Sequence, residues 1–209
     1  MTLKILGATI VIMASNFQKQ FEEIYKKNIT RDGADDFLAY LKTTDFFTAP
    51  ASTKFHSNFS GGLVEHCVKV YTRFCNMLKL EFGEKWLDDP KNRETAAIIA
   101  LLHDICKVNC YKTEMRNVKI DGEWTQKPFF AYEDPLPYGH GEKSVYIISS
   151  YMKLTREEAF AINWHMGGFD ARNLDGKFTV ASAFKQFPIA CIFSAADLLT
   201  SYLDEKVVK

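Results

Sequence analysis

Two residues with metal-binding side chains, His103 and Asp104, are adjacent in the segment LLHDICK, at the end of an otherwise apolar helical pattern. Neighbouring residues on a helix are about 100° apart, so both side chains can reach one cation beside a helix end. The second oxygen of Asp104 can extend to another cation. Because solvated or capping His-Asp pairs are common at helix ends, this pair by itself is weak evidence for a metal site.

Residues of the same ligand types occur in apolar surroundings elsewhere in the chain: His66, His140, His165 and Asp197. Any one of these histidines is more often a hydrogen-bonded core residue than a metal ligand, and a carboxylate in an apolar helix needs a partner. The complete order, however, is His, His-Asp, His, His, Asp, with each part on a separate helix or helix end. This set can provide nitrogen and oxygen ligands for two bridged first-row divalent ions.

Such a site would suit phosphate chemistry. Two cations about 3.5 to 4 Å apart lower the pKa of a bridging water, place it in line with a phosphorus atom and offset charge on the phosphoryl oxygens. The chain has no Gly-x-Ser-x-Gly sequence for a serine nucleophile, and the segment GHGEKS at 139–144 lacks the glycine spacing of a P-loop. These features favour hydrolysis of a phosphate ester, with Asp104 as a catalytic residue.

Several charged residues near the ligands are candidates for holding a substrate. Lys107, just beyond the His-Asp pair, suits a phosphate oxygen, and we expect it to act in binding and catalysis. Arg116 is equally compatible with phosphate binding and with a solvated face, whereas Lys112 and Lys143 are expected to be solvated. Asp170, which follows HMGGF, is a candidate for contacting a sugar or leaving group.

Other residues near the ligands fit two roles each. Glu65, next to His66, can orient a ligand or be solvated. Tyr111, Trp124 and Tyr138 can stack on a base, although aromatic residues in a hairpin are more often packing residues.

The elements that must position these residues are mostly helices. Apolar residues repeat at helical spacing from residue 16 and over 33–41, 62–80, 93–105, 141–152 and 184–203. Thr155, with Glu158 three residues later, matches a capping box and predicts a further helix. Residues 111–132 instead carry strand-forming residues around Asp121-Gly122, a dipeptide typical of tight hairpins. We predict a mostly α fold with a β-hairpin insertion near residues 111–132.

The chain has 209 residues, of which 47% are hydrophobic, which is enough for one domain with a substantial core. We expect a single domain over 16–209, with N-terminal helical elements at 16–48. Residues 1–15 are an uncertain extension: the apolar run fits a signal-peptide core, a buried strand or translated upstream sequence with Met13 as the start. The signal interpretation is the weakest, and deletion of residues 1–12 should leave activity intact.

The charge balance is neutral, with 26 Lys and Arg residues against 26 Asp and Glu residues, so any polyanion must be held locally. The five cysteines are scattered and odd in number, which favours a reducing compartment over a disulfide framework. We therefore predict a cytoplasmic protein with no membrane partner. The sequence carries no signal for an oligomeric state.

The segments Lys54-Phe55-His56 and Gly61-Gly62-Leu63-Val64-Glu65-His66, together with the His-Asp pair, resemble the HD-domain superfamily of metal-dependent phosphohydrolases. The similarity covers nearly the whole chain from about residue 45 and is closest to HD domains of the Gram-positive 3′→5′ exoribonuclease and relaxase-associated type. It implies an HD-domain helical bundle that uses one or two divalent ions (Mn, Fe, Co, Ni, Mg or Zn).

The resemblance also implies roles for particular residues. One metal would be held by His66, His103, Asp104 and Asp197, and Asp104 would bridge to a second metal held by His140 and His165. Some HD proteins work with a single ion. His56 resembles an additional histidine of the related exonucleases, which implies contact with the substrate phosphate. Cys106 stands where the family often has glycine, and we expect it to be a packed residue without chemistry.

The leading hypothesis is therefore a metal-dependent phosphohydrolase acting on a small phosphorylated substrate, with a mononucleotide favoured. A phosphodiesterase or 3′→5′ exonuclease acting on dinucleotides or a nucleic-acid end is the alternative, although the neutral charge and the lack of an attached OB-type module disfavour a processive nuclease. An alternative of another class is a di-iron HD-type oxygenase. A non-catalytic sensing or structural metal module is disfavoured by the full ligand set.

Overall fold

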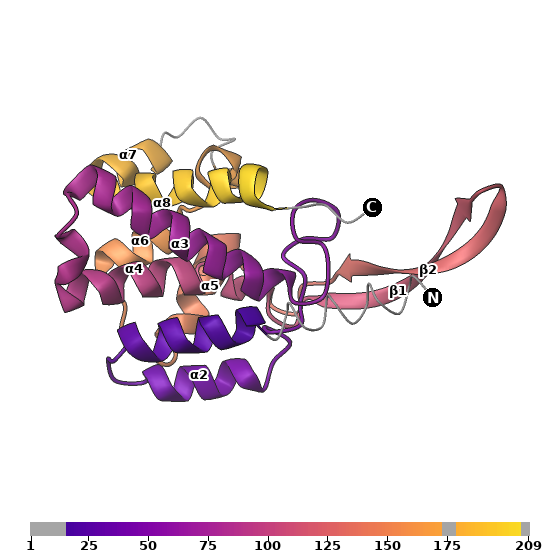
Figure 1. The fold of residues 1–209 in the computed structure, drawn as a ribbon, viewed down its shortest axis with the longest axis horizontal. Helices are drawn as coiled ribbons and strands as arrows, with labels where there is room; N and C mark the ends of the chain where they lie inside the picture. The colour runs from indigo at the N-terminus through magenta and orange to yellow at the C-terminus, as the bar shows by residue number, and fades with distance from the viewer. Residues whose placement is uncertain (1–15, 173–178, 206–209) are drawn as a thin grey trace.

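The computed structural model describes residues 16–172 and 179–205, which form a helical body with a β-hairpin projecting from it (Figure 1). This confirms the predicted mostly α fold. The predicted extension at 1–15 lies outside the described residues. After a first helix over residues 16–28, the main elements are α2 (Ala34–Lys42), α3 (Gly62–Phe82), α4 (Pro90–Leu102), β1 (Tyr111–Ile120), β2 (Glu123–Tyr132), α5 (His140–Ser149), α6 (Arg156–Asn163), α7 (Thr179–Gln186) and α8 (Pro188–Leu199).

Helices α3 and α4 form the centre of the body. The predicted apolar stripe of α3 is buried at Leu63, Val70, Phe74 and Leu78. Helix α4 is apolar on all sides in its second half, as expected of a helix with neighbours around it. Its predicted range of 93–105 was shifted: Asp89 caps the helix start by accepting a hydrogen bond from the Lys91 amide, and the helix ends at Leu102.

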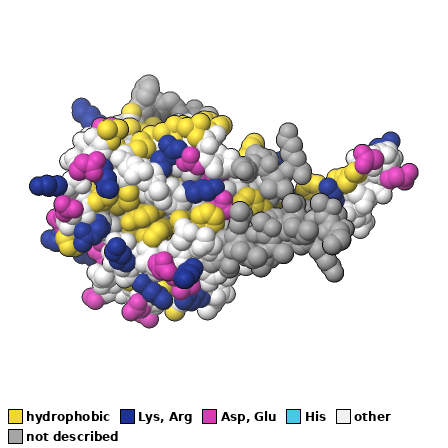
Figure 2. Space-filling model, in the orientation of Figure 1, with side chains coloured by type: hydrophobic (Ala, Val, Ile, Leu, Met, Phe, Trp, Pro, Cys, Tyr) yellow, Lys and Arg dark blue, Asp and Glu magenta, His cyan; other side chains and the backbone are white. Residues whose placement is uncertain are grey.

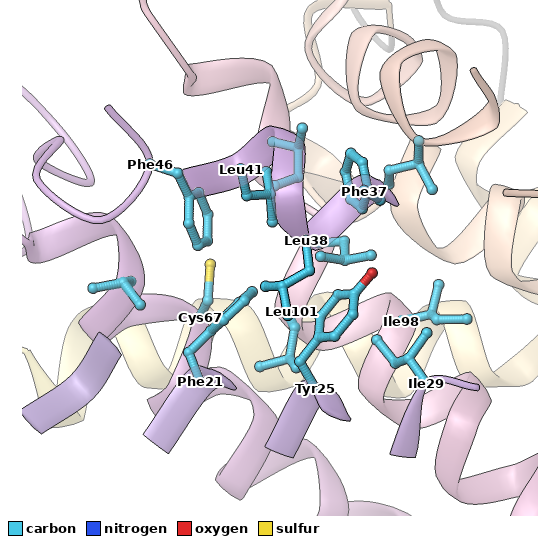
Figure 3. Packing of buried hydrophobic residues seen from close by; sticks show 14 of the residues in the cluster. Phe21, Tyr25, Ile29, Phe37, Leu38, Leu41, Phe46, Cys67, Ile98 and Leu101 are labelled. Carbon is cyan, nitrogen blue, oxygen red and sulfur yellow. The ribbon is translucent and has the colours of Figure 1, made fainter. Parts of the chain in front are cut away.

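Two apolar clusters flank this central pair. The first joins the N-terminal helices to α3 and α4 and contains Phe21, Tyr25, Phe37 and Leu101, which lie close together in Figure 3. The second packs α3 and α4 against α6 and α8. Burying one Phe or Leu side chain contributes about 1.5–3 kcal/mol, so these clusters hold the surrounding helices firmly around α3 and α4.

The β-hairpin has the predicted bounds. Strands β1 and β2 pair antiparallel in register from Tyr111 opposite Tyr132 to Ile120 opposite Glu123. The turn is Asp121-Gly122, and both residues have positive φ, 50° and 92°, as a two-residue hairpin turn requires. The base of the hairpin joins the body through the Tyr111 hydroxyl, which donates to the Ala51 carbonyl, and the rest extends away from the helices (Figure 1).

The C-terminal helical segment differs from the prediction. The expected single helix over 184–203 is divided at Phe187 into α7 and α8, because Pro188 lacks an amide hydrogen and takes the first helical position of α8 instead. Helix α8 then continues into a π-helical turn, η5 (Thr200–Asp204). The capping box of Thr155 and Glu158 at the start of α6 is confirmed, with both reciprocal hydrogen bonds formed.

On the face of the body shown in Figure 2, basic and acidic side chains are interspersed, in keeping with the neutral composition. In the described part of the chain, no single helix has both the length and the apolar composition to cross a bilayer. The helical segments Thr179–Gln186 and Pro188–Asp204 have the required length and composition only when they are counted together, and the chain bends by 115° between them.

Candidate metal centre

The carboxylate of Asp104 lies at the centre of a cluster of histidines contributed by different elements. The cluster comprises His66 on α3, His103 at the end of α4, His140 at the start of α5, His165 just after α6 and Asp197 on α8. The structure thus brings all six predicted ligands to one place, although they span 131 positions from His66 to Asp197. Their arrangement decides which chemistry they can support.

The two oxygens of Asp104 face two different pairs of histidines. Oδ2 lies 3.5 Å from Nε2 of both His66 and His103. Oδ1 lies 3.1 Å from Nε2 of His140 and 3.6 Å from Nε2 of His165. A single carboxylate therefore stands between two nitrogen pairs, as expected of a residue that bridges two cations.

Asp197 completes the first of these groups. Its Oδ1 is 3.2 Å from Nε2 of His66 and 3.9 Å from Nε2 of His103, while those two nitrogens are 3.1 Å apart. The donor atoms of His103, His165 and Asp197 also lie within 4.8 Å of one another. Two imidazole nitrogens that face each other, with carboxylates on either side, form a donor set suited to a first-row divalent ion once His66 has lost its proton.

Backbone contacts leave the correct ring nitrogens free for ligation. Nδ1 of His103 donates to the Ala100 carbonyl at 3.0 Å, and Nδ1 of His165 donates to the Ile162 carbonyl at 2.6 Å. Because a carbonyl only accepts, these bonds place the proton on Nδ1 and leave the Nε2 lone pair directed at the cluster. Nε2 of His165 is buried and has no hydrogen-bond partner among the described residues. The cluster therefore fits a metal ion.

A glycine allows the second histidine pair to form. A Cβ atom at Gly141 would lie 2.2 Å from the Asn163 carbonyl oxygen, so only glycine lets the start of α5 approach the end of α6 this closely. As a result, the rings of His140 and His165 are 5.0 Å apart between centroids. Gly141 of GHGEKS thus serves helix packing beside the cluster.

The electrostatics of the cluster favour an added positive charge. Burial lowers the pKa of His103 to about 3, so this ring is neutral. Burial alone would also lower the pKa of His66, but Glu205 and Asp197 outweigh it and raise that pKa to about 10. Burial opposes ionisation of Asp104, yet Lys107 and the histidines hold its pKa well below the usual range. A proton on His66, or a metal ion in its place, balances the buried carboxylates.

Lys107 lies where the sequence predicted, beside the His-Asp pair. Its Nζ donates to Oδ2 of Asp104 at 2.7 Å, and its side chain is largely buried. Burial disfavours the ammonium form, but Asp104 outweighs burial and raises the pKa of Lys107, so the group is charged. Lys107 is thus a fixed cation at the edge of the cluster.

Two further residues predicted to bind substrate have other partners in the structure. Arg116 is in the middle of β1, pairs with Glu114 and lies over the Phe129 ring, about 17 Å along the strand from Tyr111. Asp170 is buried, and Arg172 engages both of its oxygens at 2.8 and 2.6 Å. The structure does not bring Arg116 to the cluster, and it uses the Asp170 carboxylate to hold Arg172.

Lys143 was predicted to be solvated, and this was wrong. It is buried, and its ammonium group contacts Asp134 and the Cys110 thiol. Lys112, in contrast, is exposed and pairs with Glu133. The difference arises because Lys143 faces inward from α5 towards the base of the hairpin. The apolar pattern of α5 does not reveal this direction, because it does not show which other elements pack around the lysine.

The aromatic residues mostly pack. Tyr111 contacts Phe130 and Tyr132 edge-on at the base of the hairpin, and Tyr138 stacks on Tyr146. Trp124 is 71% exposed near the hairpin turn. Cys106 is buried as expected, but its sulfur also lies 3.3 Å from Nδ1 of His140, a contact that the sequence did not indicate.

Sequence reasoning missed Glu205. Its carboxylate contacts Nδ1 of His66 at 2.7 Å and Nδ1 of His56 at 2.6 Å, and the two histidine rings are 5.0 Å apart between centroids. Glu65, the residue considered for support of His66, instead pairs with Lys69. The one available signal was a carboxylate eight positions after Asp197.

Comparison with known proteins agrees with this geometry. The HD domain family matches residues 63–201, a range that contains all six residues of the cluster. No curated protein and no solved structure matches the chain. HD domains bind divalent metals and are generally metal-dependent phosphohydrolases. Since the match covers more than half of the sequence and includes the buried His/Asp cluster, the chain belongs to the HD-domain family.

Proposed function

We propose that the protein hydrolyses a phosphate ester of a nucleotide or nucleotide-like substrate. The observation that carries this proposal is the position of Asp104, whose two oxygens each face a separate pair of histidine nitrogens. One metal would be held by His66, His103, Asp104 and Asp197, and a second by Asp104, His140 and His165. Bound divalent ions would activate water and offset charge on phosphoryl oxygens.

The six side chains of the cluster are unequally exposed, which supports an approach of substrate from one side. The side chains of His66, His103 and His165 are at most 1% exposed, whereas those of Asp197 and His140 are 14% and 31% exposed. Substrate would therefore reach the centre past His140 and Asp197. The buried side excludes water and strengthens the electrostatic interactions inside.

The residues beside the ligands have distinct roles in this proposal. Lys107 holds Asp104 in place and provides a charged ammonium group near the substrate phosphate. His56 lies beside His66 and is partly exposed, so it can contact a phosphate without joining the first ligand group. Because the chain has no net charge, positive charge for the substrate would come from Lys107 and the bound metal ions, which favours a small substrate such as a mononucleotide over a long polyanion.

The test is a substrate screen of the full chain purified with Mn²⁺ or Co²⁺. Nucleoside mono- and triphosphates, cyclic and linear dinucleotides and short oligonucleotides are assayed for released phosphate or nucleotide product. We expect turnover of a mononucleotide. Turnover of dinucleotides or oligonucleotides alone would identify a phosphodiesterase or exonuclease. If no phosphorylated substrate reacts, and the Fe²⁺-loaded protein consumes oxygen, the hydrolase proposal is wrong and an HD-type oxygenase replaces it.

A further inference from the structure

The segment from α8 to Glu205 contacts both ring nitrogens of His66. Asp197 on α8 approaches Nε2 at 3.2 Å, and Glu205, directly after η5, approaches Nδ1 at 2.7 Å. We propose that Glu205 is a positioning residue for the metal centre, which holds the His66 ring with its Nε2 lone pair directed at the first metal. This inference rests on the proposed metal-dependent function, and it concerns a residue outside the six ligands.

The chemistry of the contact sets the tautomer of His66. An ionised carboxylate only accepts hydrogen bonds, so the proton of the metal-binding form must lie on Nδ1, and Nε2 must carry the lone pair. For His103 and His165, backbone carbonyls from the preceding helical turn perform this task. His66 lies within α3, where the carbonyls are engaged by the helix, so it needs a side-chain partner from elsewhere in the fold.

The carboxylate of Glu205 is itself fixed. Its side chain is fully buried, and its second oxygen accepts hydrogen bonds from His56 at 2.6 Å and from the Ser57 hydroxyl at 2.9 Å. Both oxygens are therefore engaged, and rotation of the carboxylate would break three contacts at once. The same group places His56 next to His66, so it connects a candidate phosphate contact with a metal ligand.

The segment that carries Glu205 is clamped to α3. Arg73 forms two hydrogen bonds with the Asp204 carboxylate, at 2.8 and 2.7 Å, and Lys69 donates to the Asp204 carbonyl. His66, Lys69 and Arg73 are spaced three and four residues apart, so they share one face of α3. This face holds the end of the C-terminal segment against His66, and Glu205 follows the π-helical turn directly with an extended backbone.

The test compares metal binding by Glu205→Ala and Glu205→Gln with that of the unsubstituted chain, by calorimetric titration of the metal-free protein with Mn²⁺. Loss of an outer carboxylate partner of a ligating histidine typically weakens metal binding by about 10–100-fold, and we expect this for Glu205→Ala. Glu205→Gln should be intermediate, because its amide oxygen can still accept from Nδ1. Glu81→Gln, an exposed position near the end of the same helix α3, is the matched control and should leave Mn²⁺ affinity unchanged.

A spectroscopic measurement separates positioning from general stability. In Zn²⁺-loaded protein labelled with ¹⁵N in its histidines, the His66 ring should show a protonated Nδ1 and a ligated Nε2, and Glu205→Gln should alter this signal while those of His103 and His165 persist. Unchanged Mn²⁺ affinity in both Glu205 variants, or an unchanged His66 signal, would overturn the proposal. An extra ion that depends on Glu205 would also overturn it, because His56, His66 and Glu205 would then be ligands themselves.

These measurements need no substrate. If Glu205→Ala weakens metal binding but no phosphate ester is hydrolysed, the positioning role stands and the proposed reaction is wrong. If hydrolysis is found and metal affinity is insensitive to Glu205, the reaction stands and the positioning role is wrong.

Discussion

Charged residues are placed in opposite ways in the β-hairpin and in the metal centre. In the hairpin, Arg116 lies directly opposite Lys127, yet both face water, where like charges are screened. In the metal centre, Asp104 is 2% exposed and lies between two pairs of histidines. Water screens the charges of the hairpin, where Arg116 also has Glu114 as a partner, whereas the buried carboxylates of the centre must be balanced by nearby positive charge, and a cation fits there.

The largest effect expected from this contrast is that of Asp104→Ala. The substitution removes the carboxylate that both histidine pairs face, so we expect metal stoichiometry to fall and turnover to drop by at least about 10³-fold, equivalent to roughly 4 kcal/mol. Metal content measured by elemental analysis and steady-state rates check the two effects together. Asp36→Ala, in an exposed position at the start of α2, is the control. Normal activity of Asp104→Ala would refute the site assignment.

A second substitution, at Phe193, tests how much the packing beside His103 contributes to the stability of the fold. Phe193 is fully buried, and its ring lies 5.0 Å from that of Phe74 and 5.2 Å from that of His103. Phe193→Ala should lower the free energy of unfolding by about 3–5 kcal/mol, because it leaves a cavity between α3 and α8. Urea denaturation of the metal-free protein measures the change. A loss below about 1 kcal/mol would mean that this wall of the site is loosely packed.

The acidity of His66 predicts how metal binding depends on pH. Its pKa in the metal-free protein is raised from 6.5 to about 10, so the ring is protonated at neutral pH and must lose a proton when it binds a metal. Affinity for Mn²⁺ should therefore rise by up to about tenfold per pH unit between about pH 6 and about pH 9. Calorimetry in buffers of different ionisation enthalpy counts the released protons. A flat pH profile would show that His66 is neutral before binding.

The smallest effects are expected in the hairpin. Trp124→Ala and Arg116→Ala replace exposed side chains far along the strands, so each should change the free energy of unfolding by less than about 0.5 kcal/mol. Turnover of a mononucleotide should stay within about twofold for both variants. A larger loss of turnover in Arg116→Ala would restore the substrate role first considered for this residue and would remove the contrast between the two regions.

Local elements followed from the sequence because their determinants lie within a few residues. Asp121-Gly122 determines its own turn, and Thr155 with Glu158 forms its own capping box. The division at Phe187 was less evident, since the apolar residues on both sides continue a helical pattern and Pro188 suits either a break or a first helical turn.

The candidate site was predictable in its residue types and not in its contacts. His66 and Asp197 stood out because ionisable groups in apolar helices need partners. Glu205 did not stand out, because it lies in a charged stretch near the end of the chain that looks solvated. Lys143 was misplaced for the same reason: the direction that a charged side chain faces depends on what packs against its helix.

The amino-acid sequence by itself determined most of the helices, the hairpin and the set of nitrogen and oxygen donors, since periodicity, turn chemistry and residue type act over short distances along the chain. Only the tertiary structure decided that the two oxygens of Asp104 face different histidine pairs and that Glu205 reaches His66 across 139 positions. Such contacts arise from the packing of α3, α4, α5, α6 and α8 around a shared core, and no local pattern encodes them.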